Sequence, residues 1–553
     1  MKSVSQTTGL RYWMLRVLEE CDKVSANFSA DPVHDLRVSL RRCRSMADGM
    51  MAMDPDPDWK AMKKAGKALF QRLGALRDVQ IMMDWIDKLE PKLVPSVARA
   101  PSPASDHEQK VLVHGELDQK LNEAAEPSDP HPPRDPAAHA LLGILRHRET
   151  EQKREARAAL EEFDRKQWRQ WSKTLPHRAA HIRPGNVVFK HLALERWTAA
   201  RDLHTRAMRN RSQVALHATR IGIKRFRYIV ENFLPVEHKL WSNDLKEMQD
   251  LLGEVHDLDL LWATAISSRI FPDADSRRRW HECIVKERTK RVEAYRRKMV
   301  GPGSLWDVWR AALPQGKQIQ QIATRRMKLW ARVLDPDFAH SERVARLALE
   351  LYDGLQRAGL FRQSASLNGS TNAVNDADGD ARPSLYAAAL LHDVGKANGK
   401  KGHHKESQSL IKKHGVPLGW SEKEMQHAAI IARFHCGALP RRGHKALRDL
   451  LPDDQKSVIG LSAILRLANA FDVAHDGQIR RIKIDTVSPP SRRTNGFLRK
   501  PPALGKNEAV VIQAEGYVGA SPTARTVAAE RYLLETVLRR PVAVKPMRVL
   551  GHS

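Results

Sequence analysis

Histidine and aspartate residues in the C-terminal half have the types and spacing to bind a metal. The doublet His392–Asp393 ends an apolar helical stretch, and further histidines stand on both sides of it: His340, His403, His404, His435 and His475. Imidazole and carboxylate groups bind divalent Mg, Mn, Fe or Zn, and a bound metal can activate water against a phosphoester or phosphoanhydride. A lone histidine is more often structural, but this set around Asp393 predicts a metal or phosphate site.

A second candidate site is a stripe of cations in VHDLRVSLRRCRSM at 33–46. On an α-helix four of these residues share an arc of about 80°: His34, Arg37, Arg41 and Arg44. Arg42 flanks the arc. Like charges at these spacings destabilise an isolated helix, so the stripe predicts a counter-charge. The counter-charge is either an anionic ligand or acidic neighbours such as Asp78 and Asp257.

The stripe occurs twice in the chain. LHATRIGIKRFRYI at 216–229 repeats it, with Arg225 beside the face that carries His217, Arg220, Lys224 and Arg227. LGALRDVQIMMDWI at 73–86 recurs as LGEVHDLDLLWATA at 252–265, and Lys67 pairs with Lys246 at the same offset. Two segments repeated in the same order with nearly equal spacing predict a duplicated helical unit.

These repeated residues resemble the conserved histidine α-helical domain, CHAD for short. Its hallmark is H-x-x-R-x-x-x-[RK]-R-x-R, followed by a Leu-Gly-x-x-Arg-Asp segment, in two halves. The first copy ends in Leu73, Gly74, Arg77 and Asp78, and the second in Leu252, Gly253, His256 and Asp257. The one departure is His256, where the pattern has Arg. The resemblance covers residues 8–300 and implies two helical bundles related by a pseudo-twofold axis, whose stripes face a shared groove that holds inorganic polyphosphate.

The resemblance also implies which residues bind the polymer: His34, Arg37, Arg41, Arg42, Arg44, Lys67, Arg77, His217, Arg220, Lys224, Arg225, Arg227 and Lys246. The composition agrees with an anionic partner, because 93 Lys and Arg against 65 Asp and Glu give a net charge of +28. A nucleic-acid-binding protein is the alternative. Aromatic residues are only 6% of the chain, which disfavours a surface that stacks bases.

The histidine-rich region, residues 330–480, resembles the HD superfamily of metal-dependent phosphohydrolases. It is most similar to the HD-type region of the exopolyphosphatase/guanosine pentaphosphate phosphohydrolase family, through His392-Asp393-x-Gly395-Lys396 and the GHHK–S segment at 402–407. The resemblance implies a divalent metal held by His340, His392, Asp393 and Asp472. It implies His392, Asp393 and Lys396 as catalytic residues, with His403, His404 and His435 as phosphate contacts or ligands of a second metal.

One position departs from the pattern of active HD proteins. Their fourth ligand is usually the Asp of a Leu-Ala-Asp segment, and here that position is Asn469. Asp472 lies one turn later on roughly the same face and is the predicted substitute. The sequence therefore leaves two alternatives for this region. It hydrolyses polyphosphate or a phosphorylated nucleotide, or it is a degenerate site in a non-enzymatic scaffold that targets polyphosphate granules.

Composition shifts along the chain predict a mostly α protein with an ordered series of parts. The first part is a CHAD-like module at 8–300, with halves 8–90 and 188–300 and a flexible Pro-rich insertion at 91–137. A linker at 301–327 follows. The remaining parts are an all-α HD-type domain at 328–480, with a disordered loop at 361–384, and a small α/β segment at 481–553.

Cysteine usage and hydropathy predict a cytoplasmic protein, at polyphosphate granules if it binds that polymer. The four cysteines are scattered without a CxxC pair, which favours free thiols in a reducing compartment. The polar N-terminus does not match a signal peptide, and no apolar run is long enough for a membrane span, so no membrane partner is expected. The sequence carries no signal for an oligomeric state.

Overall fold

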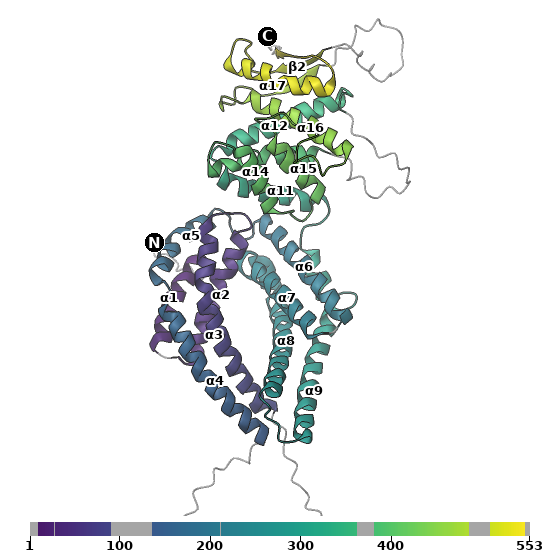
Figure 1. Cartoon of the computed structure of the whole chain (residues 1–553). Coiled ribbons are helices and arrows are strands. Elements are labelled where there is room, and N and C mark those ends of the chain that lie inside the picture. The colour runs from purple at the N-terminus through teal and green to yellow at the C-terminus, as the bar shows by residue number, and fades with distance from the viewer. Residues whose placement is uncertain are drawn as a thin grey trace, which may run out of the picture.

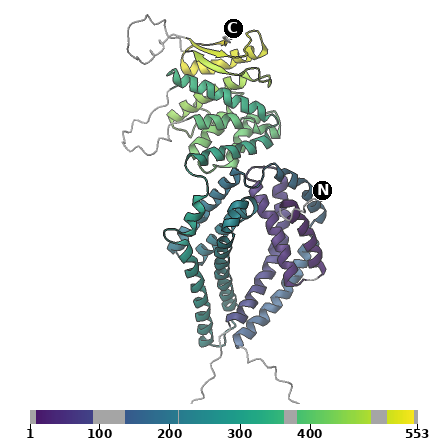
Figure 2. The ribbon, with the colours of Figure 1, turned by 180° about the vertical axis from the view of Figure 1, so that it is seen from behind.

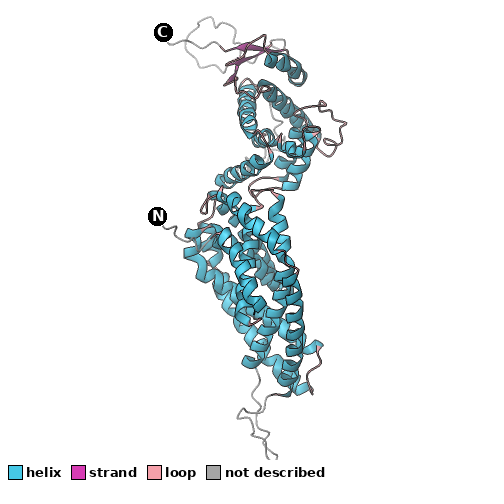
Figure 3. Cartoon of the chain, turned by 90° about the vertical axis from the view of Figure 1, so that its left-hand side faces the viewer, coloured by secondary structure: helices cyan, strands magenta, loops and turns pink. Residues whose placement is uncertain are grey.

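The computed structural model of the chain describes residues 9–26, 28–89, 135–210, 212–361, 381–485 and 509–547. They form a helical N-terminal part and a second part stacked on it (Figure 1), with a small sheet beside the C-terminus (Figure 3). The predicted mostly α fold with a small α/β tail is confirmed. No helix within the described ranges is long and apolar enough to cross a membrane. Nearly all of the predicted insertion (91–137) and loop (361–384) lies outside the described residues.

Five helices make up the first half of the N-terminal part: α1 (Leu10–Ala26), α2 (Ala30–Met50), α3 (Pro57–Leu89), α4 (Pro136–Glu161) and α5 (Arg165–Ala180). Sequence reasoning assigned residues 8–90 to this half and missed its last two helices. In the structure α4 packs along α3, and α5 packs on α1. The buried Trp168 of α5 donates from Nε1 to the Met14 carbonyl at 3.0 Å, which fixes α5 on α1.

Four helices make up the second half: α6 (Val187–Asn210), α7 (Gln213–Phe233), α8 (Pro235–Ser267) and α9 (Ala274–Met299). Equivalent helices of the two halves meet, α2 with α7 and α3 with α8. Figure 2 shows the two halves from behind, the purple and blue helices of the first beside the teal helices of the second. At Gly49, near the end of α2, a Cβ would overlap the Phe233 ring of α7. Glycine therefore lets the two stripe-bearing helices approach, and one apolar core runs through both halves.

The segment predicted as a linker, 301–327, carries α10 (Leu305–Ala311) and most of α11 (Lys317–Leu334). Trp306 and Trp309 of α10 are fully buried in the core of the N-terminal part. The apolar residues of α11 beyond its first turns belong to the core of the second part. This segment is therefore packed helix, with α10 on one part and α11 leading into the other.

Buried hydrogen bonds join the two parts. Arg326 of α11 donates to the Glu195 carboxylate of α6 at 2.7 Å and lies 3.0 Å from Nδ1 of His191. The other ring nitrogen of His191 bonds to the Leu418 carbonyl of the second part at 2.8 Å. These bonds connect Arg326 and His191 with Glu195 on one side of the interface and Leu418 on the other. Arg326 keeps only 6% of its surface exposed. The interface restrains how the two parts sit relative to each other.

The second part brings several helix ends together around one small volume. It contains α12 (Phe338–Arg357), α13 (Arg382–Leu391), the 3₁₀ helix η1 (Val394–Asn398), α14 (His403–His414), α15 (Glu422–Arg433) and α16 (Pro452–Phe471). His340 lies in the first turn of α12, the His392–Asp393 doublet directly follows α13, and His435 lies two residues past the end of α15. His403 begins α14. Side chains at such ends can converge while the helices themselves pack through their apolar faces.

The C-terminal segment is a three-stranded sheet with one helix. β1 (Ile482–Asp485) pairs antiparallel with β2 (Val510–Ala514), and β2 pairs parallel with β3 (Val542–Pro546). The helix α17 (Pro522–Leu538) connects the parallel strands and packs on α16. The segment is thereby attached to the helix that carries Asn469.

Candidate functional site

The two basic stripes face each other across α2 and α7. The Arg41 guanidinium of α2 lies 5.6 Å from the centre of the Tyr228 ring, and Nζ of Lys224 of α7 lies 5.9 Å from the same centre. Burial, and then the charges of Arg220, Arg41 and Arg37, lower the pKa of Lys224 to about 8. Cations from both halves therefore act on one another. We call this set the basic cluster: Arg37, Arg41, Arg44, Arg77, Arg220, Lys224 and Arg227.

The Leu-Gly motif has a structural reason in both copies. A Cβ on Gly74 of α3 would lie 2.8 Å from Nη1 of Arg37, and a Cβ on Gly253 of α8 would lie 3.8 Å from Nε of Arg220. The bare backbone at these positions lets the equivalent arginine of each stripe cross the neighbouring helix. The glycines thus belong to the basic cluster although they carry no charge.

Most cations of the basic cluster have no acidic partner among the described residues. Within the cluster an ion pair reaches only Arg227, at 3.9 Å from Glu231, and Glu231 also pairs with the flanking Arg42 at 2.5 Å. The predicted neighbours Asp78 and Asp257 form no ion pair within 4 Å in the described part of the chain. Burial raises the pKa of both, that of Asp257 to about 6, so these carboxylates neutralise the cluster incompletely. The explanation by acidic neighbours therefore accounts for one cation of the cluster, Arg227.

Buried donor atoms of the basic cluster also have no hydrogen-bond partner in the structure. They are Nη1 of Arg37 and the Nε atoms of Arg41, Arg44 and Arg227. A buried charged donor without a partner costs free energy, on the order of 1–3 kcal/mol or more. Such donors fit an anion with several oxygens.

The second copy differs from the first at His256, which occupies the place of Arg77. Its Nδ1 lies 3.2 Å from Nδ1 of His217, so the two rings share one proton. Burial, and then Arg220 and His217, lower the pKa of His256 to about 4, and the pKa of His217 is lowered as well. Both rings are neutral at pH 7. The second half therefore presents less positive charge than the first.

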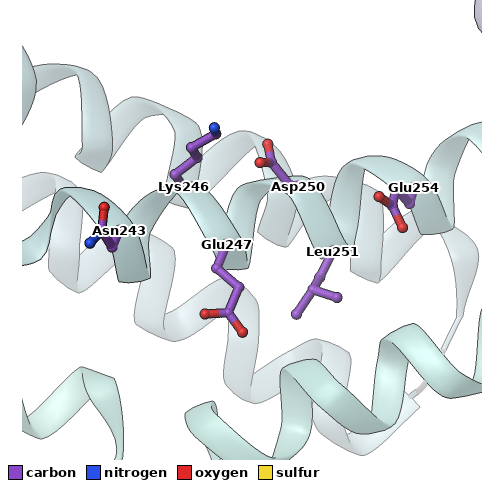
Figure 4. A pocket seen from close by; sticks show the side chains of 6 residues that line it. All are labelled: Asn243, Lys246, Glu247, Asp250, Leu251 and Glu254. Atoms are coloured by element: carbon purple, nitrogen blue, oxygen red, sulfur yellow. The ribbon is translucent and has the colours of Figure 1, made fainter.

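Six predicted binding residues lie outside the basic cluster: His34, Lys67, Arg225 and Lys246 on exposed surface, and the half-buried Arg42 and His217. Lys246 borders a hollow of about 350 Å³ along α8, where it points to the same side as Asp250 (Figure 4). Glu247, Asp250 and Glu254 also border this hollow. Three carboxylates disfavour a polyanion, so the hollow itself is a poor candidate for the site.

The second candidate site is a buried set of side chains that we call the histidine cluster: His340, His392, Asp393, His403 and His435. Three of its rings are oriented by backbone carbonyls that accept from Nδ1: Ala389 for His392 at 2.8 Å, Lys400 for His403 at 2.9 Å and Ala432 for His435 at 2.7 Å. Each Nε2 is then directed inward, where it can bind a metal once deprotonated. Such orientation by outer partners is typical of metal-binding histidines.

Asp393 stands at the centre of the histidine cluster. Its Oδ2 lies 3.3 Å from Nε2 of His392 and 2.5 Å from Nζ of Lys396. Its Oδ1 lies 3.3 Å from Nε2 of His403 and 3.6 Å from Nε2 of His435. Burial alone would raise the pKa of Asp393, but these neighbours lower it, His392 foremost. The carboxylate is therefore ionised, and its Oδ1 and Nε2 of His392 are buried without a hydrogen-bond partner.

His340 completes one side of the histidine cluster. Its Nε2 lies 3.9 Å from Oδ2 of Asp393 and 3.0 Å from Oδ1 of Asn469. Its Nδ1 bonds to Asp472 at 2.7 Å, and Asp472 also accepts from Nε of Arg343 at 2.8 Å. Asp472, predicted as a ligand, thus contacts the opposite ring nitrogen from the one that faces Asp393. Asn469 occupies the position nearer the shared space.

The remaining histidines are placed at the edge of the histidine cluster. His475 stacks on His340 at 3.8 Å between ring centres and bonds to Asp337 at 2.6 Å. His404 follows His403, and burial with the neighbouring cations lowers its pKa. Neither ring is directed at Asp393 in the described contacts. Of the predicted phosphate contacts, His403 and His435 are therefore close to the doublet and His404 lies beyond them.

Sequence reasoning missed two groups that bear on this site. Cys436 lies beside His403, with Sγ 3.8 Å from Nε2. Arg466 of α16 is buried and donates to the carbonyls of Phe434 and Gly437 at 3.1 and 3.2 Å, and it also pairs with Glu530 of α17. Arg466 thereby holds the loop that carries His435. The adjacency of Cys436 to His435 was a signal for the first group, whereas nothing local in the sequence indicates the second.

Comparison with protein families agrees with this division of the chain. Residues 14–265 match the model of the CHAD domain, and residues 322–500 match that of Ppx/GppA phosphatase, domain III. No curated protein matches the chain. These matches are consistent with a CHAD domain joined to a Ppx/GppA-like C-terminal region, and both support a polyphosphate-related function.

Proposed function

We propose that this chain, a CHAD domain joined to a Ppx/GppA-like region, binds inorganic polyphosphate at the basic cluster. One observation carries the proposal: cations of α2 and α7 face each other with buried donors that have no partner, Nη1 of Arg37 and Nε of Arg41 among them. A phosphate chain offers one charge per residue and several acceptor oxygens, which match guanidinium forks. Binding would also bring the chain to polyphosphate granules.

The same cluster is poorly suited to nucleic acid. Its aromatic rings are covered by cations: Arg37 and Arg44 lie over Phe70 at 5.3 and 4.7 Å, and Arg41 lies over Tyr228. Bases bound to a single-strand-binding surface stack on free ring faces. A ligand made only of phosphates needs no such faces.

The test is a charge reversal of two residues from each stripe, Arg37, Arg41, Arg220 and Lys224, each changed to Glu. We expect loss of polyphosphate binding with unchanged helical circular dichroism. A matched control reverses four exposed cations of α9, Arg277, Lys286, Lys290 and Arg297, and changes the net charge equally. Undiminished binding by the first variant, equal loss in both, or tighter wild-type binding to single-stranded DNA than to polyphosphate contradicts the proposal.

We propose as a second activity metal-dependent hydrolysis of a phosphoanhydride or phosphoester at the histidine cluster. The donor set fits a divalent metal, because inward Nε2 atoms surround an ionised carboxylate whose Oδ1 has no hydrogen-bond partner. His340, His392 and Asp393 would hold the ion, and Asn469 would offer a neutral oxygen. A metal bound there supplies an activated water and a Lewis acid.

The chain's own residues prepare this chemistry. Lys396 pairs with the Asp393 carboxylate at 2.5 Å, and Asp472 orients His340 through Nδ1. We therefore propose Asp472 as a positioning residue in place of its predicted role as ligand. The alternative is a degenerate site in a polyphosphate-binding scaffold. This alternative is supported by Asn469, because a neutral amide binds a metal more weakly than the aspartate of active HD proteins.

His392→Ala separates the two activities. We expect loss of bound metal and of phosphate release from polyphosphate with Mn²⁺ or Mg²⁺, while polyphosphate binding by the N-terminal part is unchanged. Asn469→Asp should raise metal affinity by adding an anionic ligand. A wild type that binds no divalent ion, releases no phosphate and gains nothing from Asn469→Asp contradicts hydrolysis and leaves the scaffold.

A further inference from the structure

Cys436 adds a soft sulfur donor to one side of the histidine cluster. Its Sγ lies 3.8 Å from Nε2 of His403, and donor atoms of His403, His435 and Cys436 all lie within 4.8 Å of one another. We propose that these three residues and Oδ1 of Asp393 form a thiolate-containing zinc site. The proposal deepens the proposed hydrolytic function, since it shares Asp393 with it, and it specifies a second ion and its identity.

Four of the six separations among these donors are close to the edges of a tetrahedron around zinc. With Zn–N near 2.0–2.1 Å and Zn–S near 2.3 Å, the edges of the tetrahedron are roughly 3.3–3.6 Å long. The two Nε2 atoms of His403 and His435 are 3.0 Å apart, and they lie 3.3 and 3.6 Å from Oδ1 of Asp393. The Sγ to Nε2 distance of 3.8 Å is near the same value. The Cys436 donor lies within 4.8 Å of that of His435, so its side chain would turn toward His435 and Asp393 to complete the tetrahedron.

The facing histidine rings require a proton or a metal ion between them. Nδ1 of His403 donates to the Lys400 carbonyl and Nδ1 of His435 donates to the Ala432 carbonyl, so the two Nε2 atoms point at each other. Oδ1 of Asp393 is directed into the same space, is buried, and has no hydrogen-bond partner. Asp393 keeps only 2% of its surface exposed. The site is therefore supported by buried, oriented donors in addition to the cysteine.

The two oxygens of Asp393 divide the histidine cluster into two donor sets. Oδ2 faces His340 and His392, where the donors are nitrogen and oxygen, whereas Oδ1 faces His403 and His435 beside the thiol. Thiolate ligands favour zinc over Mg²⁺ and Mn²⁺. The structure thus assigns a zinc preference to the second set only.

Cobalt substitution tests this site by a readout independent of activity. The full-length protein is stripped with chelator and loaded with Co²⁺, because a thiolate bound to Co²⁺ gives a strong near-ultraviolet charge-transfer band. We expect the band in the wild type and its loss in Cys436→Ser, together with the loss of one tightly bound zinc per chain. Cys283→Ser is the matched control, since Cys283 is also free and partly exposed, in α9, and should keep the band.

Further variants separate this inference from the hydrolytic proposal. His340→Ala alters only the first donor set and should keep the band, and unchanged helical circular dichroism with a cooperative thermal transition verifies that each variant folds. A wild type without the band, or a band that survives in Cys436→Ser, overturns the zinc site. A band without phosphate release keeps the zinc site and contradicts hydrolysis. Phosphate release that depends on His392 in a protein without the band contradicts the zinc site and keeps hydrolysis.

Discussion

The basic cluster gathers positive charges, whereas the histidine cluster gathers potential metal-binding atoms around a negative charge. In the first, Arg41 and Lys224 come from two equivalent helices and face each other with almost no acidic partner. In the second, the Nε2 atoms of His403 and His435 converge on the ionised Asp393. Each arrangement is unfavourable by itself and becomes favourable with a ligand of the opposite charge. The N-terminal part is therefore prepared for an anion and the second part for a cation.

The two clusters also differ in exposure to solvent. The cations of the basic cluster are mostly partly exposed, whereas His392 and His435 keep 0% and 3% of their surfaces exposed. An open site accommodates a polymer that extends beyond the protein, and a closed one suits a small ion. The N-terminal part would then keep the polymer near the second part and raise its effective concentration there.

Salt should separate the clusters most strongly. Phosphate contacts are screened and release counterions, so about seven cations predict a loss in polyphosphate affinity of roughly 10³-fold between 50 and 200 mM salt. The buried histidine cluster should retain Mn²⁺ almost unchanged over the same range. Equilibrium binding and metal analysis at each salt concentration measure both. Equal salt dependence of the two ligands would erase the proposed distinction.

Asp472→Asn tests whether the histidine cluster depends on outer partners. The change keeps the shape but removes the charge that orients His340 through Nδ1, so metal affinity should fall about 10–100-fold. Raised metal concentration should restore occupancy, because the ligands themselves remain. Asp476→Asn, an exposed neighbour, is the control. A loss that no metal concentration reverses would make Asp472 a ligand, as the sequence predicted.

The pH dependence sharpens the description of the basic cluster. Asp257, with a pKa near 6, gains negative charge as the pH rises through 6, and Lys224, with a pKa near 8, loses positive charge as the pH rises through 8. Both changes weaken the binding of an anion, so polyphosphate affinity should fall from pH 5 to pH 9. If bound polyphosphate raises one of these pKa values by one unit, the affinity falls about tenfold across that titration. Lys224→Arg should remove the upper step only. Affinity that rises with pH would contradict the proposed contacts.

How much of each cluster could be predicted depends on whether its residues lie close together in the sequence. The stripe of Arg37 and Arg41 repeats on one helix and recurs in a second copy, so helical periodicity alone placed it on one face. The meeting of α2 with α7 followed from the resemblance, and the structure confirms the fold. The histidine cluster draws on ends of several helices. Its doublet was recognised, but the contact of Cys436 with His403 is set by packing between α14 and α15.

Two differences between the sequence expectations and the structure have equally specific physical origins. Asp472 lies one turn beyond Asn469 and was predicted to replace it, but it lies just past the end of α16, and there its carboxylate accepts from Arg343 and from Nδ1 of His340. Helical spacing does not apply beyond the helix end. α4 and α5 were omitted from the first half because they carry no repeat of the stripe. Their attachment depends on contacts distant in sequence, such as that of Trp168 with Met14.

The smallest expected effect concerns the support that the C-terminal segment gives to the histidine cluster. Glu530 of α17 holds the buried Arg466 at 2.7 Å, and Arg466 donates to the carbonyls on both sides of His435 and Cys436. Glu530→Gln leaves that guanidinium without its counter-charge but keeps both carbonyl bonds, so metal affinity should fall only a few-fold, less than the roughly tenfold lower limit for an outer-shell partner. Polyphosphate binding should not change, because neither Glu530 nor Arg466 belongs to the basic cluster.

Glu535→Gln, on the same helix but without a bond to Arg466, is the matched control for metal analysis. Equal metal affinity in both variants would mean that the carbonyl bonds alone fix the loop, and a change in polyphosphate affinity would mean that the two clusters are coupled.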